Sequence, residues 1–339
     1  MKKRKSFKKC IGWILCAVML LTLIVPQNIS AAQNNNLYRY REVKTGKFGC
    51  VNRKRKVIVK PTYDFIDIFV NGLALVEKNG KYGYINSKGK EVIKVQYKQA
   101  NPFSEGLALV LEGKKYKYID KTGSTVINVK GKDPSSFSEG YASMQINGKW
   151  GYIDKTGKIV IEPKYDMAYT FMDGLAWVNE GSKEGFIDTN GNYVIKLTDK
   201  VSYASFSDGY ALVNKGNKWG FIDKKGNIVI KPTFYGATDF KEGFASIMEK
   251  VGEKYLSGYI NKKGKMITKV IYEEVDDFQE GMACVKKNGK YGFINKKGKL
   301  VVNTIYDNAF SYENGLAYVA KGSNAYFIDK TGKIVITIK

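Results

Sequence analysis

Short apolar segments alternate with glycine-containing turns along most of the chain. Residues 174–178 (Gly-Leu-Ala-Trp-Val) predict a first strand, residues 149–154 a second and residues 158–161 a third. Short runs bounded by Gly and Asn are typical of strands and are too short for most helices. Apolar side chains fall on both faces of these strands, so both faces of each sheet need cover. The pattern predicts an all-β protein made of small three-stranded antiparallel sheets.

Two kinds of turn join the predicted strands. The first is often Asn-Gly, as at residues 79–80, a dipeptide that tolerates the positive φ angles of a two-residue hairpin. The second reads Asp/Asn-x-x-Gly, as at residues 154–157, where the Asp or Asn side chain can accept backbone N–H groups. A proline then follows in three units, and we expect it to end the third strand. These prolines are Pro61, Pro163 and Pro232.

The three-strand pattern recurs, and the block Phe-x-Glu/Asp-Gly-x-Ala marks its period. The glycines of this block are Gly72, Gly106, Gly140, Gly174, Gly209, Gly243, Gly281 and Gly315. Five of the seven intervals are 34 residues, and the other two, of 35 and 38 residues, place insertions near Asp199 and within residues 249–255. Residues 33–339 therefore form one domain of about nine tandem units, in which neighbouring units share their cores.

A second block follows most of these glycines and reads Lys-Trp-Gly-Tyr-Ile-Asp in its fullest form, at residues 149–154. The block resembles the WG-repeat family of bacterial proteins, named for the Trp-Gly pair seen at residues 150–151 and 219–220. The resemblance covers about residues 37–339. Departures from it are Lys117 for the Gly, Glu184 for the aromatic residue, and Ala325-Tyr326 for the pair. The resemblance implies an interaction or surface module without a common catalytic residue.

The ends and contacts of the units lead to two further expectations. We expect the Gly after the aromatic residue to let a neighbouring ring lie across the strand. The first unit begins with residues 37–41 (Leu-Tyr-Arg-Tyr-Arg), where basic residues replace the usual Leu-Ala-Leu. We expect this first segment to be a polar cap that faces water.

The unit length bears on how the units stack. A 34-residue unit is shorter than a typical four-stranded propeller blade, and nine blades exceed the usual number. The first and last units are also in the same phase, so no strand is available for exchange between the two ends. We therefore expect the units to stack into an open superhelical array, with a closed, β-propeller-like ring as the alternative.

Residues 1–32 predict a cleavable signal peptide. A basic start precedes an apolar run of 15 residues from Ile11 to Val25, and Ser30-Ala31-Ala32 suits cleavage after Ala32. The apolar run is shorter than the roughly 20 residues that a membrane span needs, which favours cleavage over retention as an anchor. We expect a secreted or cell-wall-associated protein without a stable membrane span.

The chain is strongly basic and has few cysteines. The formal net charge is +24, and six basic residues lie in the first nine positions, so the remainder carries 24 − 6 = +18. Such an excess favours acidic partners, although lysines in solvated turns would also account for it. Cys50 and Cys284 remain after cleavage and fall in the first and eighth units. Because these units are not neighbours, we expect no disulfide between them.

The composition argues against an enzyme. Histidine is absent, which removes the commonest general base near neutral pH and the commonest metal ligand. No phosphate-binding loop, dinucleotide fingerprint or Cys-x-x-Cys motif is present, so we expect no cofactor and no metal site. The carboxylates recur from unit to unit, as Glu105 and Glu139 do, which indicates turn chemistry. A carbohydrate-active enzyme that uses two carboxylates is the minor alternative.

Two rows of side chains are candidate binding residues. Aromatic rings before the repeated Gly could stack on sugars or could be core, and lysines of the second turn could form a basic stripe or simply be solvated. The candidates are Trp150, Trp219, Tyr82, Tyr291, Lys155, Lys158, Lys224, Lys225, Lys262, Lys263, Lys296 and Lys297. We expect a monomeric, non-catalytic module that binds a protein or glycan. An electrostatic binder of anionic cell-wall polymer is the alternative, and export makes nucleic acid an unsuitable partner.

Overall fold

The computed structural model describes residues 37–42, 44–197 and 205–338. In these residues 33 strands form nine antiparallel sheets, numbered 1 to 9 along the chain. The predicted signal peptide and the insertion near Asp199 lie outside the described residues. No helix in the described part of the chain is long and apolar enough to cross a membrane.

The strands have the following bounds. Sheets 1 to 3 contain β1 (Leu37–Arg41), β2 (Phe48–Asn52), β3 (Val57–Tyr63); β4 (Phe65–Ile66), β5 (Leu73–Lys78), β6 (Lys81–Asn86), β7 (Glu91–Tyr97); β8 (Gln99–Ala100), β9 (Ala108–Glu112), β10 (Lys115–Ile119) and β11 (Thr125–Asn128). Sheets 4 to 6 contain β12 (Tyr141–Ile146), β13 (Lys149–Asp154), β14 (Ile159–Tyr165); β15 (Met167–Ala168), β16 (Ala176–Glu180), β17 (Lys183–Ile187), β18 (Tyr193–Leu197); β19 (Phe206–Ser207), β20 (Tyr210–Lys215), β21 (Lys218–Asp223) and β22 (Ile228–Phe234). Sheets 7 to 9 contain β23 (Gly236–Ala237), β24 (Phe244–Val251), β25 (Lys254–Asn261); β26 (Glu274–Val275), β27 (Met282–Lys287), β28 (Lys290–Asn295), β29 (Leu300–Tyr306); β30 (Asn308–Ala309), β31 (Ala317–Lys321), β32 (Asn324–Ile328) and β33 (Ile334–Ile338).

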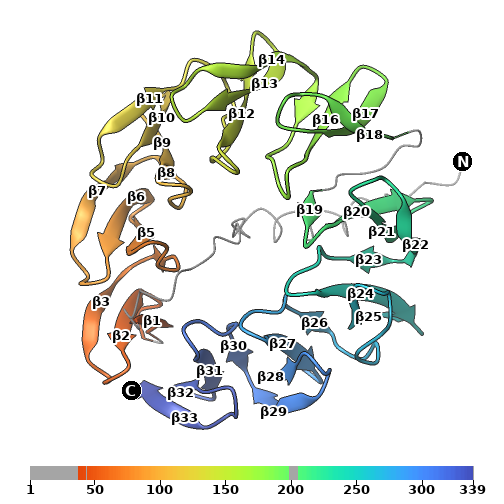
Figure 1. Cartoon of the computed structure of the whole chain (residues 1–339). Helices are drawn as coiled ribbons and strands as arrows, with labels where there is room; N and C mark the ends of the chain where they lie inside the picture. Colours follow the sequence, from red (N-terminus) through yellow and green to blue (C-terminus); the bar gives the residue numbers. More distant parts are fainter. Residues whose placement is uncertain (1–36, 43, 198–204, 339) are drawn as a thin grey trace, which may run out of the picture. The chain divides into compact units, whose positions relative to one another are not determined.

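The sheets follow one another around a ring, and sheet 1 packs on sheet 9 (Figure 1). The fold is therefore a nine-bladed, propeller-like ring. The all-β prediction is confirmed, the expected open superhelical array is wrong, and the alternative of a closed ring is correct. The unit is shorter than usual because its additional strand, where one is present, has only two residues, as in β4 and β15.

The ring closes without strand exchange, since every sheet consists of strands that are consecutive in the chain. Side chains make the closing contact instead: Tyr38 and Tyr40 of β1 share a buried cluster with Phe327 of β32. The rings of Tyr38 and Phe327 lie 5.2 Å apart between centroids. The expected polar cap at residues 37–41 is thus wrong, because Leu37, Tyr38 and Tyr40 are buried against the last sheet.

A pair of aromatic rings fills most junctions between neighbouring sheets. In sheet 4 the buried Tyr152 contacts Phe171 of the next unit with 4.8 Å between ring centroids, and Tyr84 contacts Phe103 at the same distance. The Tyr152 hydroxyl donates a 2.7 Å hydrogen bond to the carbonyl of Tyr169. The stacking of units on one another, predicted from the two apolar faces of each strand, is confirmed by these shared cores.

The glycine after the aromatic residue serves a different purpose from the one expected. A Cβ at Gly151 would lie 2.6 Å from the carbonyl oxygen of Ile161 and 2.8 Å from the nitrogen of Pro163. The backbone of the outer strand, not a neighbouring ring, therefore requires the glycine. The register shifts at this point between Trp150 and Tyr152, as in a β-bulge.

The prolines lie inside the outer strands and do not end them. Pro163 is the fifth of the seven residues of β14, and Pro61 has the same place in β3. An outer strand at a bulge tolerates proline because its N–H is not needed for the sheet. The prediction that these prolines stop the strand is wrong.

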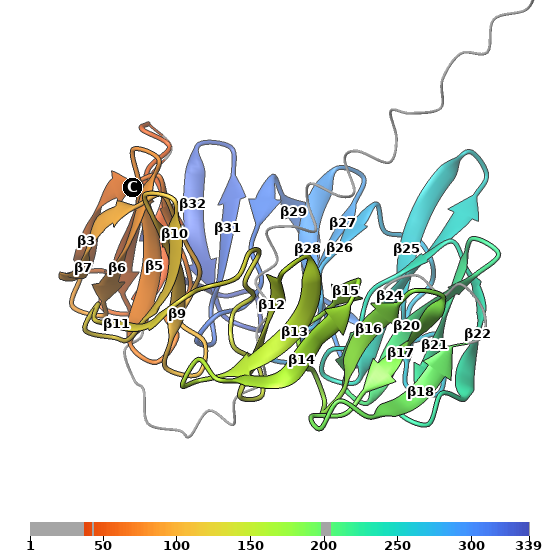
Figure 2. The same ribbon diagram turned by 90° about the horizontal axis from the view of Figure 1, so that it is seen from above.

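The two kinds of turn lie at opposite ends of the strands. The first hairpins point to one side of the ring, as β24–β25 and β31–β32 do in Figure 2. We call this side the hairpin end. The Phe-x-Glu/Asp-Gly and Asp/Asn-x-x-Gly turns lie at the other, the turn end. Cys50 and Cys284 are both free and buried, as expected for sheets that are not neighbours.

Candidate functional site

At the turn end, the repeated carboxylates connect neighbouring sheets. Glu139 Oε2 accepts a 2.8 Å hydrogen bond from the N–H of Gly174, one unit further along the chain. The same bond, between 2.7 and 3.0 Å, joins Glu105 to Gly140, Asp173 to Gly209, Asp208 to Gly243, Glu242 to Gly281 and Glu280 to Gly315. These carboxylates, which we call the carboxylate belt, support the fold at every turn where they occur.

Two of the predicted lysines pair with this belt, and two others have partners nearby. Lys155 Nζ lies 2.8 Å from Glu105 Oε2, and Lys296 Nζ lies 3.1 Å from Glu242 Oε2. Lys224 donates a 2.5 Å hydrogen bond to the carbonyl of Asp173, and Lys262 lies 5.7 Å from the ring centroid of Tyr210. The predicted basic stripe is therefore interleaved with acidic groups. The second lysine of each turn is exposed, at Lys158, Lys225, Lys263 and Lys297.

The Asp of the Asp-x-x-Gly turn has a structural role. Asp154 Oδ1 accepts hydrogen bonds from the hydroxyl of Thr156 and from the N–H groups of Thr156 and Lys158. These bonds, the hydroxyl bond foremost, lower the pKa of Asp154 although partial burial opposes them. The pKa of Asp223 is lowered in the same way, first by the side chain of Asn227. Such carboxylates stay ionised, and their oxygens already accept hydrogen bonds. They are therefore poorly suited to act as general acids.

The predicted aromatic residues lie at the hairpin end, where each pairs across the sheet with a ring of the outer strand. Trp150 lies opposite Tyr165, and Trp219 lies opposite Phe234. Tyr82 and Tyr291 have the same arrangement with Tyr97 and Tyr306. All four candidate rings are partly buried, so they contribute to packing while part of each ring faces solvent.

The structure does not bring the two predicted rows together. Trp150 is the second residue of β13, and Lys155 follows its last residue. A strand rises about 3.3 Å per residue, so these side chains lie at opposite ends of the sheet. One compact ligand cannot contact both rows.

Ion pairs connect neighbouring sheets at the hairpin end. Asp166 accepts a 2.5 Å hydrogen bond from Lys149 of sheet 4 and a 2.7 Å bond from the N–H of Gly181 in sheet 5. These two bonds, the lysine bond first, lower the pKa of Asp166. Asp64 bridges Lys47 and the N–H of Asn79, and Asp307 bridges Lys290 and the N–H of Gly322. We call this arrangement the Lys–Asp bridge.

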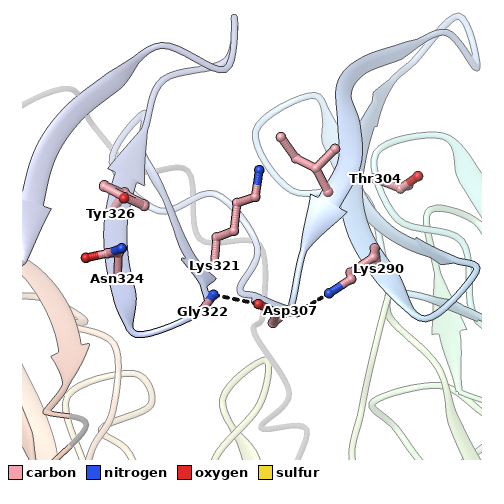
Figure 3. A pocket seen from close by; sticks show the side chains of 8 residues that line it. Lys290, Thr304, Asp307, Lys321, Gly322, Asn324 and Tyr326 are labelled. Carbon is pink, nitrogen blue, oxygen red and sulfur yellow. Dashed lines mark hydrogen bonds and ion pairs between the residues drawn. The ribbon is translucent and has the colours of Figure 1, made fainter.

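A groove of about 720 Å³ lies at one such bridge, between sheets 8 and 9 (Figure 3). Asp307 forms its base, the exposed Ile305 lines one side, and Lys321, Asn324 and Tyr326 line the other. Tyr326 occupies the place that Gly has in other units, and the outer strand pairs there in regular register with Tyr326 opposite Thr337. The departure noted in the sequence therefore provides the ring that lines this groove.

A second groove, of about 380 Å³, lies where the ring closes. Phe48 and Arg41 of sheet 1 face Phe310 and Tyr318 of sheet 9. Phe310 is 43% exposed and stacks on Tyr318 with 5.3 Å between centroids. No pattern in the sequence pointed to this groove, because its two sides are more than 250 residues apart in the chain.

Sheets 6 and 7 depart from the repeat at the hairpin end in two places. Tyr235 stands where the Lys–Asp bridge has Asp, and Lys218 Nζ lies 3.0 Å from the centroid of its ring. Tyr255, in the predicted insertion, makes an edge-to-face contact with Tyr235 at 5.6 Å between centroids. Tyr235 and Tyr255 are 42% and 51% exposed. The longer repeat interval pointed to Tyr255, whereas Tyr235 was missed.

Acidic groups also gather where sheets 7 and 8 meet. Burial first, and then the charge of Asp277, raise the pKa of Asp239 to about 6, and Lys241 opposes this. Lys241 Nζ lies 3.1 Å from Asp277. Among the described residues, no group of His, Cys, Asp or Glu side chains is arranged to hold a metal ion.

Comparisons with known proteins agree with the repeat and the fold. The model of the WG containing repeat matches residues 48–82, 82–116, 118–150, 150–183, 185–219, 219–255, 258–291 and 291–324. No curated protein matches the chain. A crystal structure of the eukaryotic initiation factor has a TM-score of 0.61 at 11% identity, over 89% of this chain and 95% of that chain. The dihydro-heme d1 dehydrogenase NirN in complex with DHE has a TM-score of 0.48 at 14% identity, over 94% and 75%. The first likeness supports the fold alone.

Proposed function

Because this chain belongs to the family of proteins with WG containing repeats, we propose that it is a non-catalytic binding or scaffold module. Its partner is a protein or a glycan, and it acts outside the cell or at the cell wall. Recognition takes place at the hairpin end of the ring, where units depart from the repeat.

The carboxylate belt is the observation that carries this proposal. A glycosidase needs two carboxyl groups that are available to the substrate. Here the repeated carboxylates accept N–H groups of the next unit, as Glu139 does from Gly174, and others carry lysine partners, as Glu105 does. The recurrent acidic residues are therefore part of the fold, which favours binding over catalysis.

The hairpin end offers the surfaces that a binding module needs. The groove beside Tyr326 combines an aromatic ring, the exposed Ile305 and the ammonium of Lys321. Binding sites usually combine apolar walls with a few polar groups in this way. Both grooves are open to solvent, which suits a polymer or a protein surface better than an enclosed small molecule.

The electrostatic alternative has less support at the turn end. The lysines there share their surface with the carboxylate belt, and Lys155 and Lys296 are paired with it. The overall excess of basic residues still favours the approach of an acidic partner.

Retention on purified cell wall at rising salt tests the proposal. Specific binding should persist at about 1 M salt, where charges are screened beyond about 3 Å. We expect Tyr326→Ala, which alters the groove of Figure 3, to weaken retention, and Lys225→Ala, an exposed residue of the turn end, to leave it unchanged.

The opposite results would favour the alternatives. Retention that disappears with salt and falls with Lys225→Ala supports a purely electrostatic binder. Hydrolysis of any member of a glycan panel by the purified protein would overturn the non-catalytic assignment.

A further inference from the structure

In three units the lysine at the start of the middle strand forms a Lys–Asp bridge. Lys47, Lys149 and Lys290 each hold an Asp of the following unit. That Asp also accepts an N–H of the next hairpin, with Gly181 and Gly322 both at 2.7 Å. In these three units the residue directly after the outer strand thus supplies the carboxylate for this lysine.

Sheet 6 provides the lysine but not the carboxylate. Lys218 is equivalent to Lys149, and Tyr235 occupies the position of Asp166. The Lys218 ammonium lies over the Tyr235 ring. Because the ring carries no negative charge, a carboxylate partner for Lys218 would have to come from another molecule. A carboxylate pairs with a lysine more strongly than a ring does when both are partly desolvated.

The hairpin of sheet 7 extends beside this lysine. β24 and β25 have eight residues each, compared with six in β5 and β6. The added residues place Tyr255 against Tyr235 and leave Val251 47% exposed. Two exposed tyrosines beside a lysine have the composition of an interface centre, in which tyrosine is enriched.

The edge of β25 is also open to pairing. Sheet 7 has the order β23-β24-β25, so β25 is its outer strand. On the outer side of β25, backbone pairing with the following segment begins at Ser257, which pairs with Tyr272. Residues 254–256 of β25 lie beyond this pairing. An extended peptide can add to such a strand edge through main-chain hydrogen bonds.

We propose that Lys218, Tyr235 and Tyr255 form a docking site for an extended acidic peptide segment of a partner protein. The segment places a carboxylate at Lys218, as Asp166 does at Lys149, and an aromatic or apolar side chain against Tyr255. This proposal rests on the proposed binding function and gives it a location and a partner chemistry.

A peptide fits this surface better than an acidic sugar does. A sugar ring needs an open aromatic face, but Lys218 covers one face of Tyr235 and the edge-to-face contact with Tyr255 occupies another side. The strand edge at residues 254–256 offers main-chain groups that a sugar does not match in register.

The test measures binding of a random Glu-Tyr copolymer to the purified protein, with poly-L-glutamate and polygalacturonate as comparison probes. Tyr235→Asp supplies the internal carboxylate seen in the three bridges, so it should keep the protein folded and weaken copolymer binding roughly five- to tenfold. Lys218→Met and Tyr255→Ala should weaken it as well. Thr62→Asp has the same charge change at an exposed position of sheet 1 and should change binding less than about twofold.

Each outcome bears on the proposal. Equal losses in Tyr235→Asp and Thr62→Asp, or no loss in any of the three site variants, would overturn it. Tighter binding of polygalacturonate that the same variants abolish would replace the peptide with an acidic glycan. If Tyr235→Asp weakens copolymer binding but cell-wall retention stays unchanged, the docking site is separate from that retention. If the unaltered protein is not retained on cell wall but binds the copolymer at this site, the proposed cell-wall partner is wrong. The proposed docking site is then still supported.

Discussion

Neighbouring sheets are held together by different residues at two junctions of the ring, the one between sheets 4 and 5 and the one between sheets 9 and 1. The first uses repeated residues: Phe171 against Tyr152, and Glu139 bound to Gly174. The second has Asn314 at the belt position, whose carbonyl accepts a 3.3 Å bond from the Tyr38 hydroxyl. Closure thus depends on Tyr38, which stands where later units have Ala, and the repeat alone does not specify it.

Arg39 is the centre of the closing junction. Its guanidinium lies 3.1 Å from Glu313 of sheet 9 and donates a 3.1 Å hydrogen bond to the carbonyl of Ile66 in sheet 2. One side chain therefore connects the last, first and second units. An ordinary junction has a continuous chain across it, whereas the contacts described at this junction each involve a side chain, so we expect it to be the first to open.

The largest expected effect is at the ordinary junction. Phe171→Ala removes a fully buried ring that contacts Tyr141 and Tyr152 and should lower the free energy of unfolding by about 3–5 kcal/mol. Chemical denaturation measures it. Tyr255→Ala, which removes an exposed ring, is the control and should change stability by less than about 0.5 kcal/mol. Similar losses in the two variants would contradict the junction as the source of stability.

Arg39→Met tests the closing junction and should cost about 2 kcal/mol. Hydrogen exchange should rise first in sheets 1 and 9, which distinguishes opening of the ring from general loss of stability. Lys158→Met is the charge-matched control, since Lys158 is exposed in sheet 4, away from the closing junction. Faster exchange spread evenly over all sheets would show that Arg39 has no special part in closure.

The cost of Arg39→Met should also depend on pH. Burial raises the pKa of Glu313 above its ordinary value, and Arg39 opposes that rise. Without Arg39 the folded protein holds the Glu313 proton more tightly than the unfolded chain does, so protonation favours folding. The destabilisation should be largest near neutral pH and should shrink as pH falls toward the ordinary pKa of Glu. Denaturation at several pH values checks this, and a cost that grows on acidification would contradict it.

Glu139→Ala is expected to have the smallest effect, about 1 kcal/mol, because it removes one exposed acceptor of the carboxylate belt. Glu139→Gln keeps an oxygen acceptor and should recover about half of that loss. Thermal denaturation of both variants measures the difference. If Ala is as stable as Glu at this position, the belt does not contribute to the ordinary junction.

The sequence predicted the local structure well because its determinants are local. Asn79-Gly80 and Asp154 to Gly157 fix their turns through φ angles and short-range hydrogen bonds, and both are as predicted. The eight repeat glycines and the first unit that precedes them predicted about nine units, and nine sheets are seen in the described residues. The roles of Gly151 and Pro163 were misjudged, because both respond to a bulge in the neighbouring strand.

The sequence by itself determined the repeat, the strands, the turns and the family of this protein, since each depends on residues close together in the chain. Only the tertiary structure decided that the array closes, because Tyr38 meets Phe327 across nearly the whole length of the chain. It also placed the predicted aromatic and lysine rows at opposite ends of the strands and set Tyr235 beside Tyr255. Contacts between distant residues depend on the twist summed over nine sheets, which no single repeat contains.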